Sequence, residues 1–265
     1  MRLSAYIGGI GVLGPGLHNW PHAAAVLSGK QPYVAAPTLL PTPAMLPPAE
    51  RRRTGRVVKL ALAVALEATA NADADPTLLP SVFSSSGSDG HICHEICQAL
   101  ALPAREVSPT RFSNSVHNVA AGYWSIATGS MTESNVLCAF DASFIAGLLD
   151  ALTQVAVDRQ SVLLVAYDTE YPAPLHAKRP IPDALGAAMV LTPERNAASI
   201  AKVDLTLTDE TGDNMPDLQL EALRRAIPAA RSLPLLRLLA IGAAGRAVLD
   251  YLDVSRAAVQ IEPCR

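Results

Sequence analysis

Apolar runs of strand length alternate along this chain with longer segments whose apolar residues recur at helical spacing. Strands are predicted at residues 3–9, 80–87, 134–142, 161–170, 186–194 and 198–210, and as a closing hairpin at 246–252 and 257–263. Helices are predicted at residues 19–29, 48–70, 89–102, 143–157, 216–227 and 232–241, and around 120–126. This order predicts an α/β protein with helices on both faces of its sheet.

Two segments refine this pattern. The strand at 161–170 is apolar almost throughout, which is typical of a strand covered on both faces. Residues 32–48 are rich in proline, which excludes regular structure and predicts an ordered surface loop. Because the chain contains no short-period repeat and no linker, we expect residues 1–265 to form a single domain.

The composition favours a large core and a large interface. Half of the 265 residues are hydrophobic and 17% are charged, against about one quarter charged in an average protein. The formal net charge is −3, which provides no basic footprint for nucleic acid. We therefore expect no nucleic-acid partner.

The cysteines and the N-terminal segment predict a cytoplasmic location. Four cysteines, Cys93, Cys97, Cys138 and Cys264, do not form the dense pattern of a disulfide framework. Glycines and a proline interrupt the first sixteen residues, which is not typical of a signal peptide. No uncharged apolar run reaches the roughly 18 residues of a membrane span, so none is predicted.

One cluster has the residue types of a metal site. The segment is "HICHEIC", in which Cys93, His94 and Cys97 are types that zinc binds. A zinc site needs three or four converging ligands, whereas His91 and His94 share one helix face and Cys93 and Cys97 share another. The pattern favours a partly buried helix whose cysteines act as small hydrophobic residues, with no metal and no cofactor.

The glycines near the N-terminus have spacing that loosely suggests a nucleotide loop. The segment is "GGIGVLG", at residues 8–14. A dinucleotide fingerprint requires a helix directly after the glycines and an acidic residue about twenty positions later. Here Pro15 and Gly16 interrupt the turn and no such acid follows, so we interpret the segment as a tight exit from a strand.

A strand, a sharp turn and a helix follow one another in "CAFDASFIAGL", at residues 138–148, and such turns can hold a nucleophile. Ser143 lies at the turn, but the chain reads "FDASFIA" there, with Asp141 and Phe144 in place of the G-x-S-x-G elbow. The only later histidine that could act as a base is His176. We interpret Ser143 as a helix N-cap, while acyl transfer by Ser143 or Cys138 stays open.

Several polar residues at the ends of elements have simpler interpretations. Asp168 and Glu170 end an apolar strand, where functional carboxylates often lie. Without a partner base, they are interpreted as solvated turn residues. His117 and Asn118 precede an apolar helix and are interpreted as structural rather than catalytic.

Taken in order, five segments resemble the N-terminal half of a β-ketoacyl synthase. They are residues 5–33, 108–129, 134–152, 160–170 and 181–194. In the second segment, Asn118, Ala121 and Gly122 take the places of that family's "NM.AG" motif. The resemblance covers about residues 1–205. It implies a thiolase-like layered α/β/α fold with a much shortened C-terminal part, residues 206–265.

The departures from the family imply that catalysis has been lost. The family's cysteine falls within Ala142–Phe144, most naturally at Ser143, and no cysteine is present there. Cys138 lies about one turn too early, and no histidine follows His176 to supply the family's catalytic pair. The chain also ends where the family's second half would begin.

The resemblance therefore implies a chain-length factor of the aryl polyene or pigment type, which pairs with an active ketosynthase as a heterodimer and meets acyl carrier protein through that complex. A homodimeric acyl-binding module and a stand-alone acyl transferase are the alternatives. The low charge agrees with a large obligate interface.

The resemblance also implies two groups of site residues. The acyl tunnel is expected to be lined by Phe112, Val116, Trp124, Phe140 and Phe144. The partner interface is expected to include Ser115, His117, Asn118, Asn135, Val136, Leu137, Cys138 and Ala139. Ala142, Ser143 and Phe144 form the degenerate nucleophile turn, and no catalytic residue is predicted.

Overall fold

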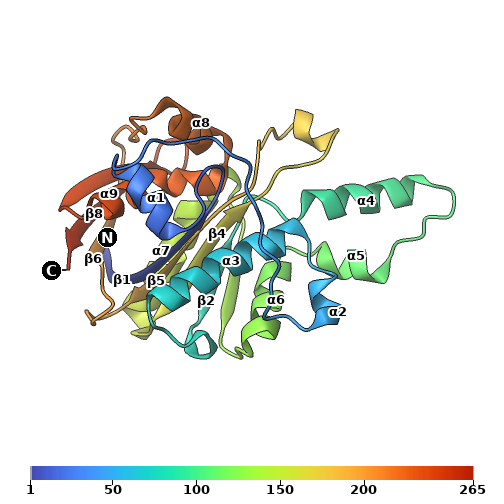
Figure 1. Ribbon diagram of the computed structural model, residues 1–265, viewed down its shortest axis with the longest axis horizontal. Coiled ribbons are helices and arrows are strands. Elements are labelled where there is room, and N and C mark those ends of the chain that lie inside the picture. Colours follow the sequence, from blue (N-terminus) through green and yellow to red (C-terminus); the bar gives the residue numbers. More distant parts are fainter. Residues whose placement is uncertain (1, 265) are drawn as a thin grey trace.

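A mixed sheet of eight strands runs through the part of the protein that the computed structural model describes, residues 2–264 (Figure 1). The strand order is β3-β2-β4-β5-β1-β6-β8-β7. The strands are β1 (Arg2–Leu13), β2 (Ser81–Ser84), β3 (Ser134–Leu137), β4 (Val162–Asp168), β5 (Leu185–Thr192), β6 (Ala201–Thr208), β7 (Gly245–Asp250) and β8 (Arg256–Pro263). Strands β3, β2 and β4 are parallel, and the other neighbours pair antiparallel.

Helices cover both faces of this sheet, as the sequence pattern predicts. They are α1 (Trp20–Leu27), α2 (Pro48–Arg51), α3 (Arg56–Asn71), α4 (Gly90–Ala101), α5 (Pro109–Asn114), α6 (Val119–Thr128), α7 (Ser143–Asp158), α8 (Leu218–Ala226) and α9 (Leu233–Ile241). Helices α1, α7 and α9 share one hydrophobic core with the sheet, and α3 and α6 form a second core with it. The result is a layered α/β/α arrangement.

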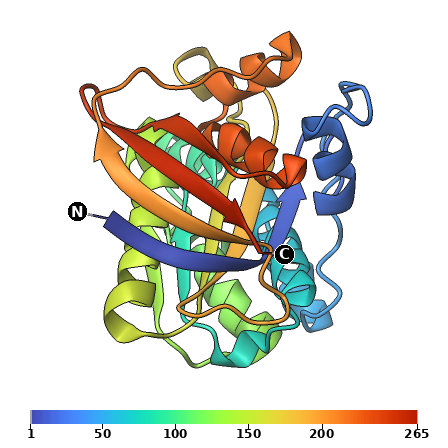
Figure 2. The same cartoon turned by 90° about the vertical axis from the view of Figure 1, so that its left-hand side faces the viewer.

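The C-terminal residues extend the same sheet and the first of these cores. Strands β8 and β7 continue the sheet beyond β6, and they pair as the predicted hairpin (Figure 2). A 3-10 turn, η4 (Pro228–Ser232), buries apolar side chains beside α7, and helix α9 buries its own beside α1. Helices α4 and α5, by contrast, project from the body as an arm (Figure 1).

All of the glycine-rich segment except Gly14 lies inside β1, so its interpretation as a strand exit is wrong. A Cβ atom at Gly9 would lie 2.2 Å from the carbonyl oxygen of Ala68, and one at Gly11 would lie 2.1 Å from that of Val64. The absence of side chains therefore lets α3 rest directly on the strand. Asn71 on the same helix donates a hydrogen bond of 2.7 Å to the carbonyl of Ile10.

Other boundaries differ from the prediction for local reasons. The single helix predicted over 48–70 is two helices, because Thr54 Oγ1 donates to the Arg51 carbonyl and Gly55 then adopts an extended backbone as the N-cap of α3. The strand predicted over 134–142 ends at Leu137. Asn19, as predicted, caps α1 by accepting a hydrogen bond from the His22 amide.

Within residues 2–264, one helical segment, Phe140–Asp158, is long and apolar enough to cross a membrane by length and composition. Half of its most apolar 18-residue stretch is buried inside the protein. Helix α7 packs there against β4, β2 and η4, and the core helix of a folded protein meets the same criterion.

Replacing Gly11 tests the contact between β1 and α3. We expect Gly11→Ala to lower the free energy of unfolding by about 3 kcal/mol, because the new methyl group meets helix backbone that cannot move aside. Denaturant unfolding of the purified protein measures this. Gly122→Ala on α6 is the control: nothing lies within 4 Å of its Cβ position, so the change should stabilise the helix by about 0.5–1 kcal/mol. Equal effects at both glycines would contradict the account.

Candidate functional site

A turn of serines, Ser84–Gly87, begins at the last residue of β2 and connects the segments around the degenerate nucleophile turn. Ser84 Oγ donates to the carbonyl of Ser143, and the Ser85 amide donates to the carbonyl of Leu137 at 3.2 Å. Helix α7 comes close to this turn because Gly147 carries no side chain: a Cβ there would lie 2.7 Å from Ser84 Cβ. The turn thus fixes the end of β3 and the start of α7 together.

Asp168 is the buried centre of this network, so its interpretation as a solvated residue is wrong. Only 4% of it is exposed. One carboxylate oxygen accepts from the Ser86 amide at 2.8 Å and from Ser86 Oγ at 2.6 Å. The other accepts from the Ala229 amide in η4 at 2.8 Å. Burial raises the pKa of Asp168 to about 6, although these three donors act in the opposite direction.

Glu170, two residues further along, is partly exposed and also has partners. Its carboxylate lies 2.5 Å from Nε of Arg56 and 3.8 Å from Nε2 of His91. The pair joins the start of α3 to the segment after β4. Such a partly exposed pair contributes little to stability, so we assign it a positioning role for this segment.

Ser143 is the first residue of α7 and is not its N-cap, so that prediction is wrong. The N-cap is Ala142, which makes no side-chain hydrogen bond. Ser143 Oγ instead accepts from the Ala139 amide at 3.0 Å and donates to the Phe140 carbonyl at 2.7 Å. The hydroxyl therefore closes the preceding 3-10 turn, η2 (Phe140–Ala142), and Ser143 is 1% exposed.

Two arginines hold the middle of the turn. Arg179, from the segment between β4 and β5, and Arg231, from η4, both form ion pairs with Asp141. The Arg179 guanidinium also lies 3.9 Å from the centre of the Phe140 ring, in a cation–π contact. Phe140 has a left-handed backbone with φ of 51°, which is uncommon for a bulky residue. These contacts hold that strained conformation in place.

Cys138 lies at the exposed edge of the same region. Its Sγ atom donates to the carbonyl of Ser86 at 3.3 Å.

A pocket of about 300 Å³ lies nearby, between α4 and the segment after β4, and its walls include Cys93, Ile96 and Tyr171. Tyr171 packs directly on Gly90, where a Cβ would lie 2.0 Å from the ring. Burial raises the pKa of Tyr171, and the Asp168 carboxylate raises it further.

The five residues expected in the tunnel fall into two groups. Phe112, Val116 and Phe140 are exposed, at 65%, 44% and 62%. Trp124 and Phe144 are each 1% exposed, and they belong to the two separate cores on opposite sides of the sheet. The structure does not bring these two side chains together. Among residues 2–264, the Trp124 indole N–H has no hydrogen-bond acceptor.

The residues expected at the partner interface lie along the free edge of the sheet and at the base of the arm. Strand β3 is an edge strand that pairs only with β2 among the described residues, and it carries Asn135, Val136 and Leu137. Cys138 and Ala139 follow it. At the base of the arm, Ser88 Oγ donates to the carbonyls of Ser115 and Val116, and His117 and Asn118 come next before α6.

Sequence reasoning missed three side chains around the turn, Tyr171, Arg179 and Arg231. The arginines lie 38 and 90 residues from Asp141, so no local pattern connects them. In the described part of the chain, no three histidine, cysteine or acidic residues gather as a metal site would require. Cys93 and Cys97 are free thiols.

The fold corresponds to that of a known family. The family described as "Beta-ketoacyl synthase, N-terminal domain" matches residues 18–234. The chain therefore belongs to this family, and the α/β fold inferred from the sequence, the thiolase-like fold of ketosynthases, is confirmed. No curated protein matches the chain.

Solved structures with the same fold include complexes of ketosynthases. One is the ketosynthase (ApeO) in complex with its chain length factor (ApeC) from Xenorhabdus doucetiae, with 23% identity, a TM-score of 0.73, and coverage of 97% of this chain and 99% of that one. A second is the ishigamide ketosynthase/chain length factor, with 14% identity, a TM-score of 0.72 and coverage of 99% and 100%. A third is AntDE:AntF, a type II polyketide synthase acyl-carrier protein in complex with its ketosynthase, with 11% identity, a TM-score of 0.74 and full coverage of both chains.

The pKa of Asp168 gives a direct test of the buried network. A folded-state pKa of about 6 lies above the ordinary value of 3.8, so the folded protein takes up this proton first as the pH falls. Acidification from pH 7 to pH 5 should therefore raise the contribution of Asp168 to the free energy of unfolding. Carboxyl-carbon NMR should show one titration near pH 6 that is missing in Asp168→Asn. Titration of this group near pH 4 would contradict the proposed burial.

Proposed function

We propose that this protein is a non-catalytic chain-length factor, which pairs with an active β-ketoacyl synthase and shapes the tunnel for the growing acyl chain. The observation that carries the proposal is that the polar side chains of the turn before α7 are already bonded to other groups of the protein. Both hydrogen bonds of Ser143 Oγ go to backbone groups, and two arginines hold Asp141 beside it. A serine nucleophile needs a free hydroxyl and a neighbouring base.

The surface around the turn supports pairing with a second subunit. Strand β3 presents unpaired backbone groups along the edge of the sheet, which proteins usually cover. Phe112, Val116 and Phe140 add exposed apolar side chains near the arm and the turn. Apolar groups exposed together mark interaction surfaces. The chain length factor in the Xenorhabdus complex has a ketosynthase partner, and we assign the same kind of partner to this chain.

The same exposed residues are our candidates for setting product length. A rigid apolar product requires a dry tunnel with bulky walls, and a tunnel at a subunit boundary draws its walls from exposed side chains. Trp124 and Phe144 are buried in the cores, so we assign them a supporting role behind that wall. The carrier protein would deliver its acyl group through the complex, as a type II acyl-carrier protein binds the ketosynthase of AntDE:AntF.

A second candidate function rests on Cys138. Its thiol is exposed and lies close to the degenerate turn, which favours acyl transfer by this chain itself. The position of Cys138 in the chain argues against acyl transfer by its thiol. Cys138 precedes η2 and α7, so it lacks the helix N-terminus that stabilises a thiolate. Free thiols at all four cysteines are consistent with a cytoplasmic location, which we include in the proposal.

A charge at the β3 edge or on the arm should separate the two subunits. We expect Val136→Arg and Phe112→Asp to abolish the one-to-one complex with a co-expressed ketosynthase, because each buries an unpaired charge in the contact. Size-exclusion chromatography with light scattering measures the complex, and circular dichroism verifies that each variant folds.

Val254→Arg is the matched control, because Val254 is 82% exposed in the loop between β7 and β8, at the opposite edge of the sheet. It should leave the complex intact. A folded Val136→Arg or Phe112→Asp protein that still forms the complex would place the interface elsewhere.

Truncation of the two groups of aromatic residues should have different effects on product length. Phe112→Ala and Phe140→Ala should leave a stable complex that makes longer chains, because the wall has been cut back. Trp124→Ala should cost about 3–5 kcal/mol of stability, without a change in length. Mass spectra of carrier-bound products measure this. Unchanged lengths in both exposed variants would remove the length-setting role from this surface.

A further inference from the structure

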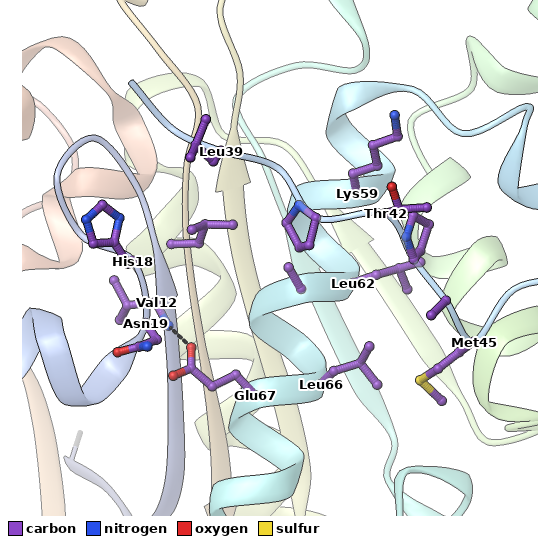
Figure 3. A pocket seen from close by; sticks show the side chains of 15 residues that line it. Val12, His18, Asn19, Leu39, Thr42, Met45, Lys59, Leu62, Leu66 and Glu67 are labelled. Carbon is purple, nitrogen blue, oxygen red and sulfur yellow. Dashed lines mark hydrogen bonds between the residues drawn. The ribbon is translucent and has the colours of Figure 1, made fainter. Parts of the chain in front are cut away.

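A cavity of about 530 Å³ lies on the α3 side of the sheet, and none of the residues at the degenerate turn lines it. Its floor is α3 and the end of β1, and its roof is residues 39–45 of the proline-rich loop, which cross over α3 (Figure 3). We call these residues the strap. The volume falls within the range of about 300–1,000 Å³ that is typical of small-molecule sites.

The walls of this cavity are apolar. Leu62 and Leu66 line it from α3, and Leu39 and Met45 line it from the strap (Figure 3). Leu39 is 78% exposed and Met45 is 47% exposed, so two large apolar side chains of the strap remain open to solvent. The strap is nevertheless held in place from both sides. Just before it, the Thr38 hydroxyl donates to the Ala184 carbonyl, and just after it, Leu46 is 1% exposed. A preformed apolar space of this kind suits an apolar ligand.

Of the two charged residues at the cavity, Lys59 favours an anion. The carboxylate of Glu67 is already used, because it accepts from the amides of Val12 at 2.9 Å and Trp20 at 2.6 Å. Lys59, one of the lining residues, has no ion pair within residues 2–264. A ligand with one negative end group could thus pair with the Lys59 amine at the rim and bury its apolar part against Leu62 and Leu66.

We propose that this cavity binds an amphipathic carboxylate with a linear apolar chain, of the fatty-acid class, independently of any tunnel at the subunit boundary. The carboxylate pairs with Lys59, and the chain lies between α3 and the strap. The proposal does not depend on the role assigned to the degenerate turn. That turn leads into α7, which packs in one hydrophobic core, whereas α3 packs in the other core, on the opposite face of the sheet.

Calorimetric titration of the full-length protein with decanoate tests this site. We expect one saturable site per chain. Ala63→Phe, which places a ring in the cavity from α3, should weaken binding more than tenfold. Leu39→Asp, on the exposed strap, should do the same by removing apolar wall and adding repulsion, and it disturbs no core packing. Ala70→Phe is the matched control, because Ala70 is exposed on the same helix and does not line the cavity.

The charge is tested separately. Lys59→Gln should weaken decanoate binding about tenfold and leave the binding of decanol, which has no charge, unchanged. No saturable binding of decanoate, or binding that survives both Ala63→Phe and Leu39→Asp, would overturn the site. Equal binding of decanoate by Lys59→Gln and the native protein would overturn the choice of an anionic ligand.

Discussion

A buried carboxylate sets the geometry on which the candidate site depends. Removing the charge of Asp168 from water is costly unless donors surround it, and its three donors come from two other segments, the serine turn after β2 and the 3-10 turn η4. The C-terminal part of the chain is thereby fixed against the N-terminal strands. Since the serine turn also binds the end of β3 and the start of α7, the position of Asp168 determines where the degenerate turn lies.

Side-chain contacts hold the degenerate turn in one conformation. Ser143 closes it with two backbone hydrogen bonds, and Arg179 and Arg231 neutralise Asp141. These contacts hold Phe140 in a left-handed conformation with its ring exposed beside the free edge of the sheet. In the complex that we propose, this turn presents shape and apolar surface to the ketosynthase subunit. That is the basis on which we connect the fold, which chain length factors share, to the proposed role.

Periodicity in the sequence was sufficient to predict the α/β class, most strands and the closing hairpin, because burial on two faces of a sheet leaves a local pattern. It failed where a contact joins residues far apart in the chain. The glycines of β1 could be understood only with α3 in place, and Asp168 resembled a solvated residue because its donors lie 61 and 82 positions away. The arginines that hold Asp141 were invisible for the same reason. The resemblance to ketosynthases directed attention to this turn, but it did not predict the bonds that close it.

Intact-protein mass spectrometry of the complex after exposure to an acyl donor tests the central claim most directly. The purified complex of this chain with its ketosynthase is incubated with acyl carrier protein loaded with an acyl thioester, and each subunit is then weighed. The account predicts an acyl adduct on the ketosynthase subunit alone. An adduct on this chain, mapped by peptide analysis to Ser143 or Cys138, would contradict it.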